Sequence, residues 1–416
     1  MNKRTMLIFS QVYVPDPASV GQHMHDAAAE MLRRGFRVIV YASSRGYDDP
    51  TISYPRRETR DGVEIRRLPF TSFGKSSIFI RLIAGFSFVL QCSLRGMLVP
   101  RLAGILVSTS PPVCPLAAVF LGMVRRRPVV YWLMDLNPDQ TVVLGKMSER
   151  SVVVRLFEWM NRLILRRAAG IVTLDRFMAD RVNRKVDIRE KMAVMPPWPH
   201  EDELESISHE NNPFRKQHGL EGKFVIMYSG NHSLASPLKT VLEAALLLQD
   251  DPDLVFMFVG GGLGKKEVDE AIQRHQPNNI RSLPYQPLDR IRYSLSAADV
   301  HLVAVGPLMV GIVHPCKVYG AMAVGRPILL LGPSPCHVSD IAAENEIGWQ
   351  IDYDDVSGAE TVIRSIRTTD KTVLNEMGQR ARNLVADRYS KEKLLKQFCD
   401  TLERHVLPGR DRPDSQ

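Results

Sequence analysis

The 416-residue sequence is poor in cysteine, and its five cysteines include no Cys-x-x-Cys pair. An odd number of unclustered cysteines argues against a disulfide scaffold and a cysteine-type zinc site, and it indicates a reducing cytoplasm. Long apolar runs are also missing. The longest, Leu82–Leu94, is interrupted by Ser87, Gln91 and Ser93, whereas a membrane span needs about 20 apolar residues. Nor does the start resemble a signal peptide. We therefore expect a chain without spans, located in the cytoplasm or at the inner face of its membrane.

The sequence also lacks the usual nucleotide and metal fingerprints. Gly260, Gly261, Gly262 and Gly264 do not match GxGxxG, because Lys265 stands where the third glycine belongs. This absence disfavours an NAD-dependent dehydrogenase. The segment 229–233 has no Walker lysine, and the Asp-x-Asp pattern at 352–354 is more typical of an acidic surface turn than of a metal site. We therefore predict no metal and no cofactor.

Acidic residues are scarce in the first half of the chain. Lys and Arg exceed Asp and Glu by 14 in residues 1–200, whereas residues 201–416 carry a net charge of −6. A basic half indicates an anionic partner, which could be nucleic acid, anionic lipid or a phosphorylated substrate. Nucleic acid is disfavoured, because the basic residues are scattered and no zinc-finger spacing or basic patch interleaved with aromatic residues accompanies them.

Short apolar runs alternate with helical patterns in both halves. We expect strands at 6–10, 38–41, 105–108, 129–133 and 171–174, and again at 224–228, 254–259, 280–283, 300–303 and 327–331. This alternation predicts an α/β protein with two doubly wound, Rossmann-like domains facing a cleft. The expected divisions are a basic N-terminal domain (1–195), a connection (196–222), a C-terminal domain (223–388), a final helix (389–407) and a polar tail (408–416).

Ligands of such sheets bind at loops that follow the carboxyl ends of strands. Four of these loops carry candidate residues: Gly21 and Gln22; Asp135; Gly230, Asn231, His232 and Ser233 with Gly261 nearby; and Gly311, Val313, His314 and Lys317. Glycine lets a ligand approach the backbone, and helix N-termini favour anions. Lys317 opposes the dipole of its own helix unless an anion lies there.

Structural explanations compete at each loop. Residues 17–23 could be an ordinary helix start, and 260–264 a tight turn. His314 could be a structural histidine. The Asn-Pro-Asp turn explains Asp139 better than Asp135.

Seven segments, in order, resemble bacterial family 4 glycosyltransferases, nearest to a branch concerned with O-antigen, capsule and exopolysaccharide assembly. The segments are 16–43, 134–145, 194–199, 225–245, 256–262, 283–303 and 310–333, the last reading VGIVHPCKVYGAMAVGRPILLLGP. The resemblance covers nearly the whole chain. It implies a GT-B fold with the nucleotide sugar mainly on the C-terminal domain, no bound metal, and retention of anomeric configuration.

The resemblance also implies roles for individual residues. Gly230 and Asn231 would lie against the diphosphate, Tyr285 and Gln286 near the base, and Lys317 near phosphate, with Gly21 and Gln22 closing over the donor. Asp135 would face the transferred sugar or the acceptor. The amides of 230–233 and 311–314 would share the negative charge, and the helix around 390–405 would return towards the first domain.

Several positions depart from the family pattern. Ile312 and Gly320 replace two Glu residues that contact the donor, Asn231 and Ser236 replace a basic pair, and Met134 replaces a histidine. Lys239 could replace the basic pair only if its helix is shifted. Because Lys317, Asp135 and the Ser-Gly-Asn turn are present together, we favour an active enzyme.

The sequence thus predicts transfer of sugar from a nucleoside diphosphate sugar to a lipid-linked or saccharide acceptor. The alternatives are a catalytically silent GT-B partner subunit and a nucleotide-sugar epimerase. An anionic membrane surface or a lipid diphosphate would meet Arg66, Arg67, Arg81, Arg95 and Arg101, which surround the apolar region 76–100.

Overall fold

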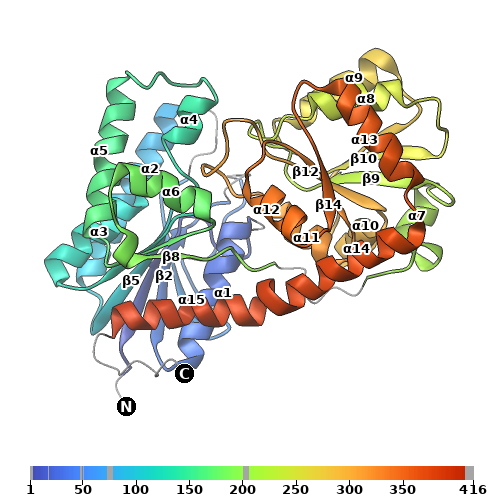
Figure 1. Cartoon of the computed structure of the whole chain (residues 1–416). Coiled ribbons are helices and arrows are strands. Elements are labelled where there is room, and N and C mark those ends of the chain that lie inside the picture. Colours follow the sequence, from blue (N-terminus) through green and yellow to red (C-terminus); the bar gives the residue numbers. More distant parts are fainter. Residues whose placement is uncertain are drawn as a thin grey trace. The chain divides into compact units, whose positions relative to one another are not determined.

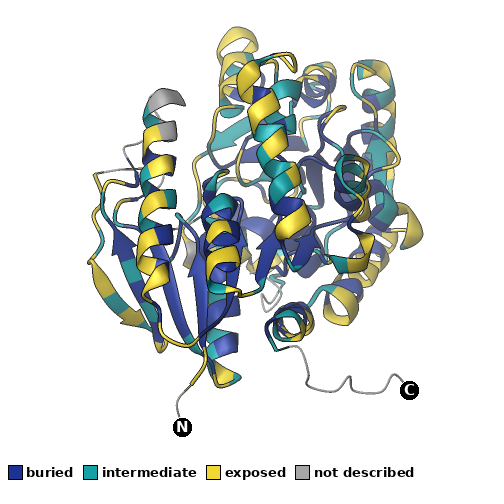
Figure 2. Cartoon of the chain, turned by 90° about the vertical axis from the view of Figure 1, so that its left-hand side faces the viewer, coloured by how far each residue is buried: buried dark blue, intermediate teal, exposed yellow. Residues whose placement is uncertain are grey.

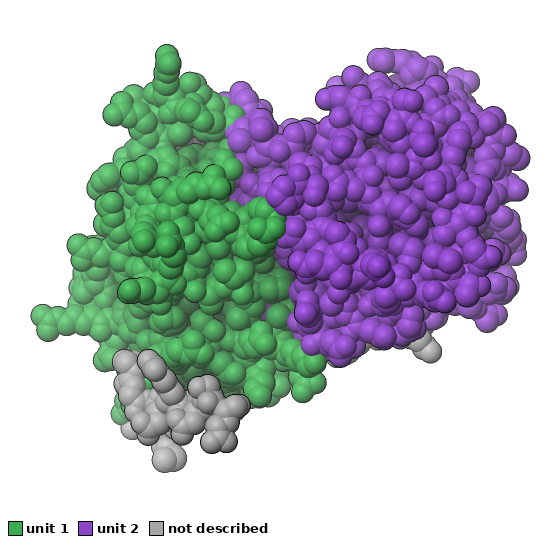
Figure 3. Space-filling view, viewed as in Figure 1, with its two compact units in different colours: residues 1–142, 147–197, 392–416 green, residues 143–146, 198–391 purple. Residues whose placement is uncertain are grey.

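The chain forms two units in the computed structural model, which describes residues 3–16, 18–46, 49, 51–72, 78–199 and 206–407. Unit 1 holds residues 1–142, 147–197 and 392–416, and unit 2 holds residues 143–146 and 198–391 (Figure 3). Pro17, residues 200–205 of the expected connection and the expected tail at 408–416 lie outside the described residues. The last helix follows unit 2 in sequence but belongs to unit 1.

Unit 1 is built on an eight-stranded sheet in the order β3-β4-β2-β1-β5-β6-β7-β8, in which only the β3–β4 pair is antiparallel. Its strands are β1 (Thr5–Phe9), β2 (Arg37–Ser43), β3 (Arg57–Arg60), β4 (Val63–Leu68), β5 (Leu102–Ser108), β6 (Val129–Trp132), β7 (Gly170–Thr173) and β8 (Met192–Val194). The central strands are apolar throughout because helices cover both faces of a parallel sheet. Sequence patterning found β1, β2, β5, β6 and β7, and it missed β4 and the edge strands β3 and β8.

The helices of unit 1, apart from the last one, connect these strands (Figure 1). They are α1 (Ser19–Arg33), α2 (Ile78–Met97), α3 (Cys114–Arg125), α4 (Asp139–Val143), α5 (Val152–Arg167), α6 (Arg176–Lys185) and α15 (Lys391–Val406). Helix α3 packs between α2 and α5 and against β5. No helix in the described part of the chain is long and apolar enough to cross a membrane.

Helix α15 is held to unit 1 by an aromatic contact and an ion-pair cluster. The ring of Phe398 lies 4.1 Å from that of Trp132, and both side chains are buried. Arg34, just after α1, pairs with Asp400 at 2.6 Å and with Glu403 at 3.0 Å. Figure 1 shows α15 running past α1 in unit 1. A segment that ends the chain therefore completes the core of its first half.

Unit 2 has a six-stranded parallel sheet in the order β11-β10-β9-β12-β13-β14. Its strands are β9 (Phe224–Ser229), β10 (Leu254–Val259), β11 (Ile280–Leu283), β12 (Val300–Ala304), β13 (Ile328–Leu331) and β14 (Gly348–Ile351). Its helices are α7 (Pro213–Gln217), α8 (Lys239–Leu247), α9 (Lys265–His275), α10 (Ile291–Ser296), α11 (Lys317–Ala323), α12 (His337–Glu344), α13 (Val356–Thr368) and α14 (Lys371–Leu384). Apolar clusters cover both faces of this sheet.

Part of the segment expected to connect the domains belongs to the core of unit 2. Phe214 and Leu220 are buried against β9 and β10 residues. Arg215 is buried with them, and its guanidinium donates to the carbonyls of Ala297 and Leu220 at 2.5 and 2.7 Å. The polar composition of 206–222 therefore conceals a structural segment, in which backbone carbonyls satisfy the buried charge of Arg215.

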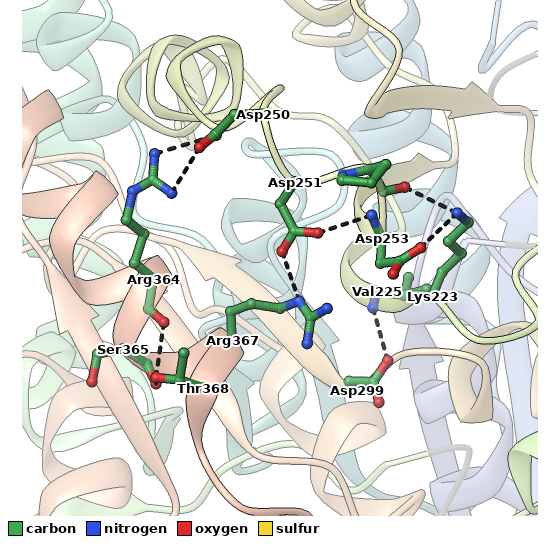
Figure 4. Close-up of polar contacts among 11 residues, drawn as sticks. Lys223, Val225, Asp250, Asp251, Asp253, Asp299, Arg364, Ser365, Arg367 and Thr368 are labelled. Carbon is green, nitrogen blue, oxygen red and sulfur yellow. Dashed lines mark hydrogen bonds and ion pairs between the residues drawn. The ribbon is translucent and has the colours of Figure 1, made fainter.

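Acidic residues of unit 2 form ion pairs at the ends of its elements (Figure 4). Arg364 and Arg367 of α13 pair with Asp250 and Asp251, which follow α8, at 3.3 and 2.9 Å. Asp251 also accepts a hydrogen bond from the Asp253 amide at 2.9 Å. These carboxylates hold helices and strands together.

Two arginines expected to meet an anionic partner are engaged inside unit 1. The Arg67 side chain is buried, pairs with Glu58 at 2.6 Å and donates to the Val14 carbonyl at 2.6 Å. Arg66 pairs with Glu64 at 2.5 Å. The expectation is therefore wrong for Arg67, whose buried guanidinium group joins β4 to neighbouring segments. Arg66 pairs within its own strand and remains partly exposed, so its expectation stays a prediction. Arg95 and Arg101 are exposed, and the side chain of Arg81 lies outside the described ones.

Replacing Phe398 with alanine should destabilise unit 1 by about 3–5 kcal/mol, because a buried ring is lost and a cavity remains. Hydrogen–deuterium exchange with mass spectrometry should become faster in β5 and β6 and stay unchanged in β9 and β10. Lys396→Ala, at an exposed position of the same helix, is the matched control and should alter neither unit. Equal acceleration in both units would contradict the packing of α15 on unit 1.

Candidate functional site

The turns after β9 and β10 approach each other closely at two glycines. Gly230 and Gly260 have φ values of +118° and +127°. A Cβ atom on Gly260 would lie 2.0 Å from the Gly230 carbonyl oxygen, a distance that no side chain allows. The Gly230 amide donates to the Val259 carbonyl at 2.9 Å. The two turns therefore form one compact surface at the carboxyl ends of neighbouring strands.

Asn231 and Tyr285 complete this surface. A Cβ on Gly262 would lie 2.3 Å from the Asn231 Oδ1 atom, so the third glycine also makes room for a neighbouring segment. The exposed Tyr285 hydroxyl donates to the Gly261 carbonyl at 3.2 Å. The Gln286 side chain is half-buried and donates to the Pro284 carbonyl at 3.1 Å. Tertiary structure thus brings together three segments that the sequence identified separately.

Lys317, the first residue of α11, lies over the Ser-Gly-Asn turn. Its Cε would be 3.1 Å from a Cβ on Gly230, and its Nζ lies 4.9 Å from the centroid of the Tyr228 ring. In the described part of the chain no carboxylate lies within ion-pair distance of this ammonium group. Among the described residues, Lys317 is therefore a cation that lies beside Gly230 and the Tyr228 ring without an acidic partner.

Only some of the expected backbone amides of 230–233 are available to an anion. The Gly230 amide is used by Val259, and the His232 amide donates to the Gly261 carbonyl at 2.7 Å. Within the described residues, the amides of Asn231 and Ser233 have no acceptor. These two N–H groups, together with the Lys317 ammonium, could bind an anion such as a phosphate.

His232 lies beneath the turn. Its side chain is buried, with Nδ1 3.1 Å from the Gly230 carbonyl oxygen and its ring 4.7 Å from that of Tyr228. Burial, followed by the charges of Lys265 and Lys317, lowers its pKa to about 4. The imidazole is therefore neutral near pH 7. Because the side chain is buried, it cannot contact a ligand, and it instead packs against the turn that contains Gly230.

Lys265 stands at the position that breaks the GxGxxG pattern and has a structural role. Its ammonium group donates to the carbonyls of Phe258 and Leu283 at 2.7 and 2.9 Å, which ties together the ends of β10 and β11. Burial lowers its pKa. Lys239 is mostly exposed and lies 3.7 Å from Glu243 along α8.

The loop before α11 differs from the expected anion-binding amides. The amides of Ile312 and Val313 donate to the Met309 carbonyl at 3.0 and 3.3 Å, so neither is available to a ligand. Gly311 is buried with a φ of +71°, which explains the glycine at that position. The expectation that these amides share the negative charge is therefore wrong for residues 312 and 313.

His314 belongs to a hydrogen-bonded chain that sequence reasoning missed. Its Nε2 lies 2.8 Å from the Tyr319 hydroxyl, which lies 2.8 Å from the Nε2 of His337. The two imidazole rings have centroids 4.4 Å apart. One hydroxyl can donate to one imidazole and accept from the other, so Tyr319 couples the tautomers of the two histidines. No spacing signal joins residues 314 and 337, because they meet only through folding.

In unit 1, Gly21 has a structural reason to be glycine. A Cβ there would lie 3.0 Å from the Tyr13 Cα atom, and the Gly21 amide donates to the Ala18 carbonyl at 2.9 Å. The backbone that approaches Gly21 is thus the chain's own. Gln22 is half-buried in the first turn of α1. The neighbouring His23 and His25 side chains contact Ser19 and Asp61.

Asp135 follows β6 and is half-buried. Desolvation raises the pKa of its carboxyl group. No donor to this carboxylate occurs among the described residues. Asp139 instead begins α4 and pairs with Arg181 at 3.0 Å and with Lys185. Asp135 is therefore the carboxylate of this loop that remains open to a ligand.

Two units, each built on a mainly parallel sheet with helices on both faces, define the architecture of the GT-B class. Residues 19–198 match the glycosyl transferase 4-like domain, and residues 210–384 match glycosyl transferases group 1. The chain belongs to this glycosyltransferase family. The expected GT-B fold with two Rossmann-like domains is confirmed.

Two curated proteins share sequence with this chain. It is 26% identical over 265 residues to a probable glycosyltransferase, WbjE, of Pseudomonas aeruginosa, a match that covers 64% of this chain and 65% of that protein. It is 25% identical over 277 residues to a putative colanic acid biosynthesis glycosyl transferase, WcaI, of Escherichia coli K12, covering 66% and 67%. The matched parts thus span about two thirds of these relatives.

Solved structures share the fold across almost the whole chain. The Anabaena protein HepE, in complex with UDP and glucose, superposes with a TM-score of 0.70 over 97% of this chain and 100% of its own, at 14% identity. At such low identity, the superposition shows a shared fold and nothing about a shared function. The ligands of HepE are properties of that protein.

Gly260→Ala should destabilise unit 2 by at least about 2 kcal/mol, because the new Cβ would collide with the Gly230 carbonyl. Chemical denaturation measures the loss, and hydrogen–deuterium exchange should localise it to β9 and β10. Gly222→Ala is the matched control, since Gly222 has a φ of +74° but no atom within 4 Å of the added carbon. Equal effects of the two variants would show that backbone strain alone matters.

Unit 2 should lose stability in acid through its buried histidines. Burial lowers the pKa values of His232 and His301 to about 4, below the ordinary 6.5. Between pH 6.5 and pH 4, each of these two histidines therefore binds a proton in the unfolded chain but not in the folded one. The free energy of unfolding that is present above pH 6.5 is lost as the pH falls towards 4, by up to about 2.7 kcal/mol per pH unit. Denaturation across these pH values should show a smaller slope in His232→Asn and no change in slope for the exposed control His275→Asn. An unchanged slope in His232→Asn would contradict this prediction.

Proposed function

We propose that this protein transfers a glycosyl unit from a nucleoside diphosphate sugar to a saccharide or lipid-linked acceptor during polysaccharide biosynthesis. We further propose that the reaction retains anomeric configuration and needs no metal. The names of WbjE and WcaI support the reaction class and the polysaccharide context. The UDP and glucose bound by HepE support a nucleoside diphosphate donor.

The observation that carries this proposal is Lys317 above the Ser-Gly-Asn turn. Its ammonium group lacks an acidic partner in the described part of the chain, and its side chain lies against Gly230. In the same turn, the amides of Asn231 and Ser233 have no acceptor among the described residues. An unpaired cation and two unsatisfied N–H groups match a diphosphate, which carries negative charge and many acceptor oxygens.

Glycosyl transfer requires stabilisation of the leaving diphosphate and of a sugar with cationic character. Lys317 and the two amides would stabilise the developing negative charge, because preorganised donors act without reorganisation during the reaction. Tyr285 and Gln286 would contact the base. Asp135 would orient the sugar or the acceptor. We propose attack on the face of the leaving group, with the departing phosphate accepting the proton of the acceptor hydroxyl.

A catalytically silent partner subunit remains the second candidate. Ile312 and Gly320 occupy the places of two donor-contacting Glu residues, and both are buried. Such a subunit would bind nucleotide weakly or not at all. An epimerase would bind nucleotide sugar but would transfer nothing to an acceptor, so a transfer assay separates it from the enzyme we propose.

Lys317→Ala should weaken nucleotide binding by about 10- to 100-fold, because a charge-assisted contact worth about 1.5–3 kcal/mol is lost. Calorimetric titration with UDP, GDP, ADP, dTDP and CMP in the presence of EDTA measures the affinity. Lys266→Ala is the control, since Lys266 is an exposed lysine of α9 that pairs with Glu270 at 3.2 Å. It should bind as the unmodified protein does.

One nucleoside diphosphate should bind, and at about 100 times its dissociation constant it should stabilise the fold by about 2.7 kcal/mol. Binding without loss in Lys317→Ala would contradict the site. Absence of binding with every nucleotide, also after addition of Mg²⁺, would contradict the enzyme and favour the silent subunit.

A further inference from the structure

Two histidines and a tyrosine of unit 2 present metal-binding atoms to one another. The Tyr319 hydroxyl oxygen lies 2.8 Å from the Nε2 atom of His314 and 2.8 Å from the Nε2 atom of His337. A ring nitrogen of one histidine also lies within 4.8 Å of a ring nitrogen of the other. Both imidazoles are half-buried, and the tyrosine is buried. We call these three side chains the His-Tyr-His cluster.

The spacing within the His-Tyr-His cluster fits ligands of a single metal ion. Imidazole nitrogens bind Zn²⁺ at about 2.0–2.1 Å, and oxygen ligands bind it at similar distances. Two ligands separated by an angle of about 90–109° around such an ion are therefore about 2.8–3.4 Å apart. Both histidine–tyrosine distances, at 2.8 Å, lie at the lower end of that range. Two nitrogens on opposite sides of one ion are at most about 4.2 Å apart, so the histidine pair needs to close by no more than about 0.6 Å.

The elements around the cluster hold its three members in place. Tyr319 lies in α11, whose residues after the first are all buried, whereas helices at the surface show exposed positions on their outer sides (Figure 2). His337 begins α12, where the Cys336 amide donates to the Ser339 hydroxyl at 2.8 Å. The His314 ring is nearly parallel to the Tyr319 ring, with an angle of 19° between them. Ligands that are already ordered lose little conformational entropy when an ion binds.

The donor atoms decide which metals the cluster can take. Imidazole suits Zn²⁺, Cu²⁺ and Ni²⁺, whereas Mg²⁺ and Ca²⁺ prefer shells of oxygen atoms. A neutral imidazole binds a metal through the ring nitrogen that carries no proton, so both histidines would carry their proton on Nδ1. A phenol binds as the phenolate. The ion would therefore replace one proton, that of the Tyr319 hydroxyl, and the two imidazoles would release none.

We propose that the His-Tyr-His cluster binds one divalent late transition metal ion, of the class of Zn²⁺. Three protein ligands leave the fourth position of a tetrahedral ion to water or an anion. The ion would join the loop before α11 to the start of α12 and so stabilise unit 2. It takes no part in the transfer step proposed above, so this inference goes beyond the proposed function. The expectation of no metal rested on motifs within single segments, whereas residues 314 and 337 meet only through folding.

Calorimetric titration of the full-length, untagged protein with Zn²⁺ at pH 8 tests the site. One ion should bind per chain, and it should raise the melting temperature. His337→Gln should weaken binding at least about tenfold, because one of three ligands is lost while the new amide can still hydrogen-bond to Tyr319. His314→Gln should have the same effect from a different segment. The matched control is His275→Gln, at the exposed end of α9, which should bind Zn²⁺ as the unmodified protein does.

The phenolate has a readout of its own. Titration in buffers of different ionisation enthalpy should show the release of about one proton per Zn²⁺ from the unmodified protein and none from Tyr319→Phe. A hydrogen-bonded chain with a purely structural role would release no proton to the ion. Cys316→Ser alters the exposed thiol two residues after His314 and should leave Zn²⁺ binding unchanged. Loss of binding in this variant would assign the ion to the thiol and overturn the proposed ligands.

Nucleotide titration in EDTA, which keeps metal from the cluster, tests the proposed function alone. Zn²⁺ binding that is lost in His337→Gln and His314→Gln supports the cluster, whether or not any nucleotide binds. Absence of Zn²⁺ binding by the unmodified protein, or equal binding by both histidine variants, would overturn the proposal. So would displacement of Zn²⁺ by an equal concentration of Mg²⁺ or Ca²⁺, because the ligands would then be oxygen atoms.

Discussion

The close approach of Gly230 and Gly260 is the constraint on which the candidate site depends. With no Cβ between them, the carbonyl of one glycine lies against the α-carbon of the other. This contact joins the turns after β9 and β10 and leaves the amides of Asn231 and Ser233 without acceptors. A larger residue would separate the turns, and the surface below Lys317 would be lost.

Charge around this surface is divided among residues with different tasks. Lys265 is used inside the fold, where its ammonium group binds two strand-end carbonyls. His232 lies below the turn and stays neutral, because burial and two nearby lysines oppose its protonation. The remaining cation is Lys317, which has no acidic partner among the described residues. Two of the three basic groups thus have structural roles, and Lys317 is the one that we propose acts on a ligand.

The basic half of the chain shows a similar division. Arg67 and Arg125 donate to backbone carbonyls and hold segments of unit 1 together. Arg95 and Arg155, on helices with exposed apolar side chains, remain at the surface. A net charge counted from the sequence includes both the arginines that are hydrogen-bonded inside the fold and those that remain at the surface. Because the internal ones are already satisfied by the fold, the charge open to a partner is smaller and more localised than the count indicates.

The sequence by itself determined the α/β class, most buried strands and the loops that contain Gly230 and Lys317. Apolar periodicity reports how each segment is buried, and parallel sheets place their functional loops at known strand ends. Only the tertiary structure decided that the edge strand β8 exists and that His314 contacts Tyr319, which contacts His337. Periodicity describes one segment at a time, whereas these features depend on which distant segments meet. The sequence also could not predict that the amides of Ile312 and Val313 donate to the Met309 carbonyl, because that contact depends on how the loop folds.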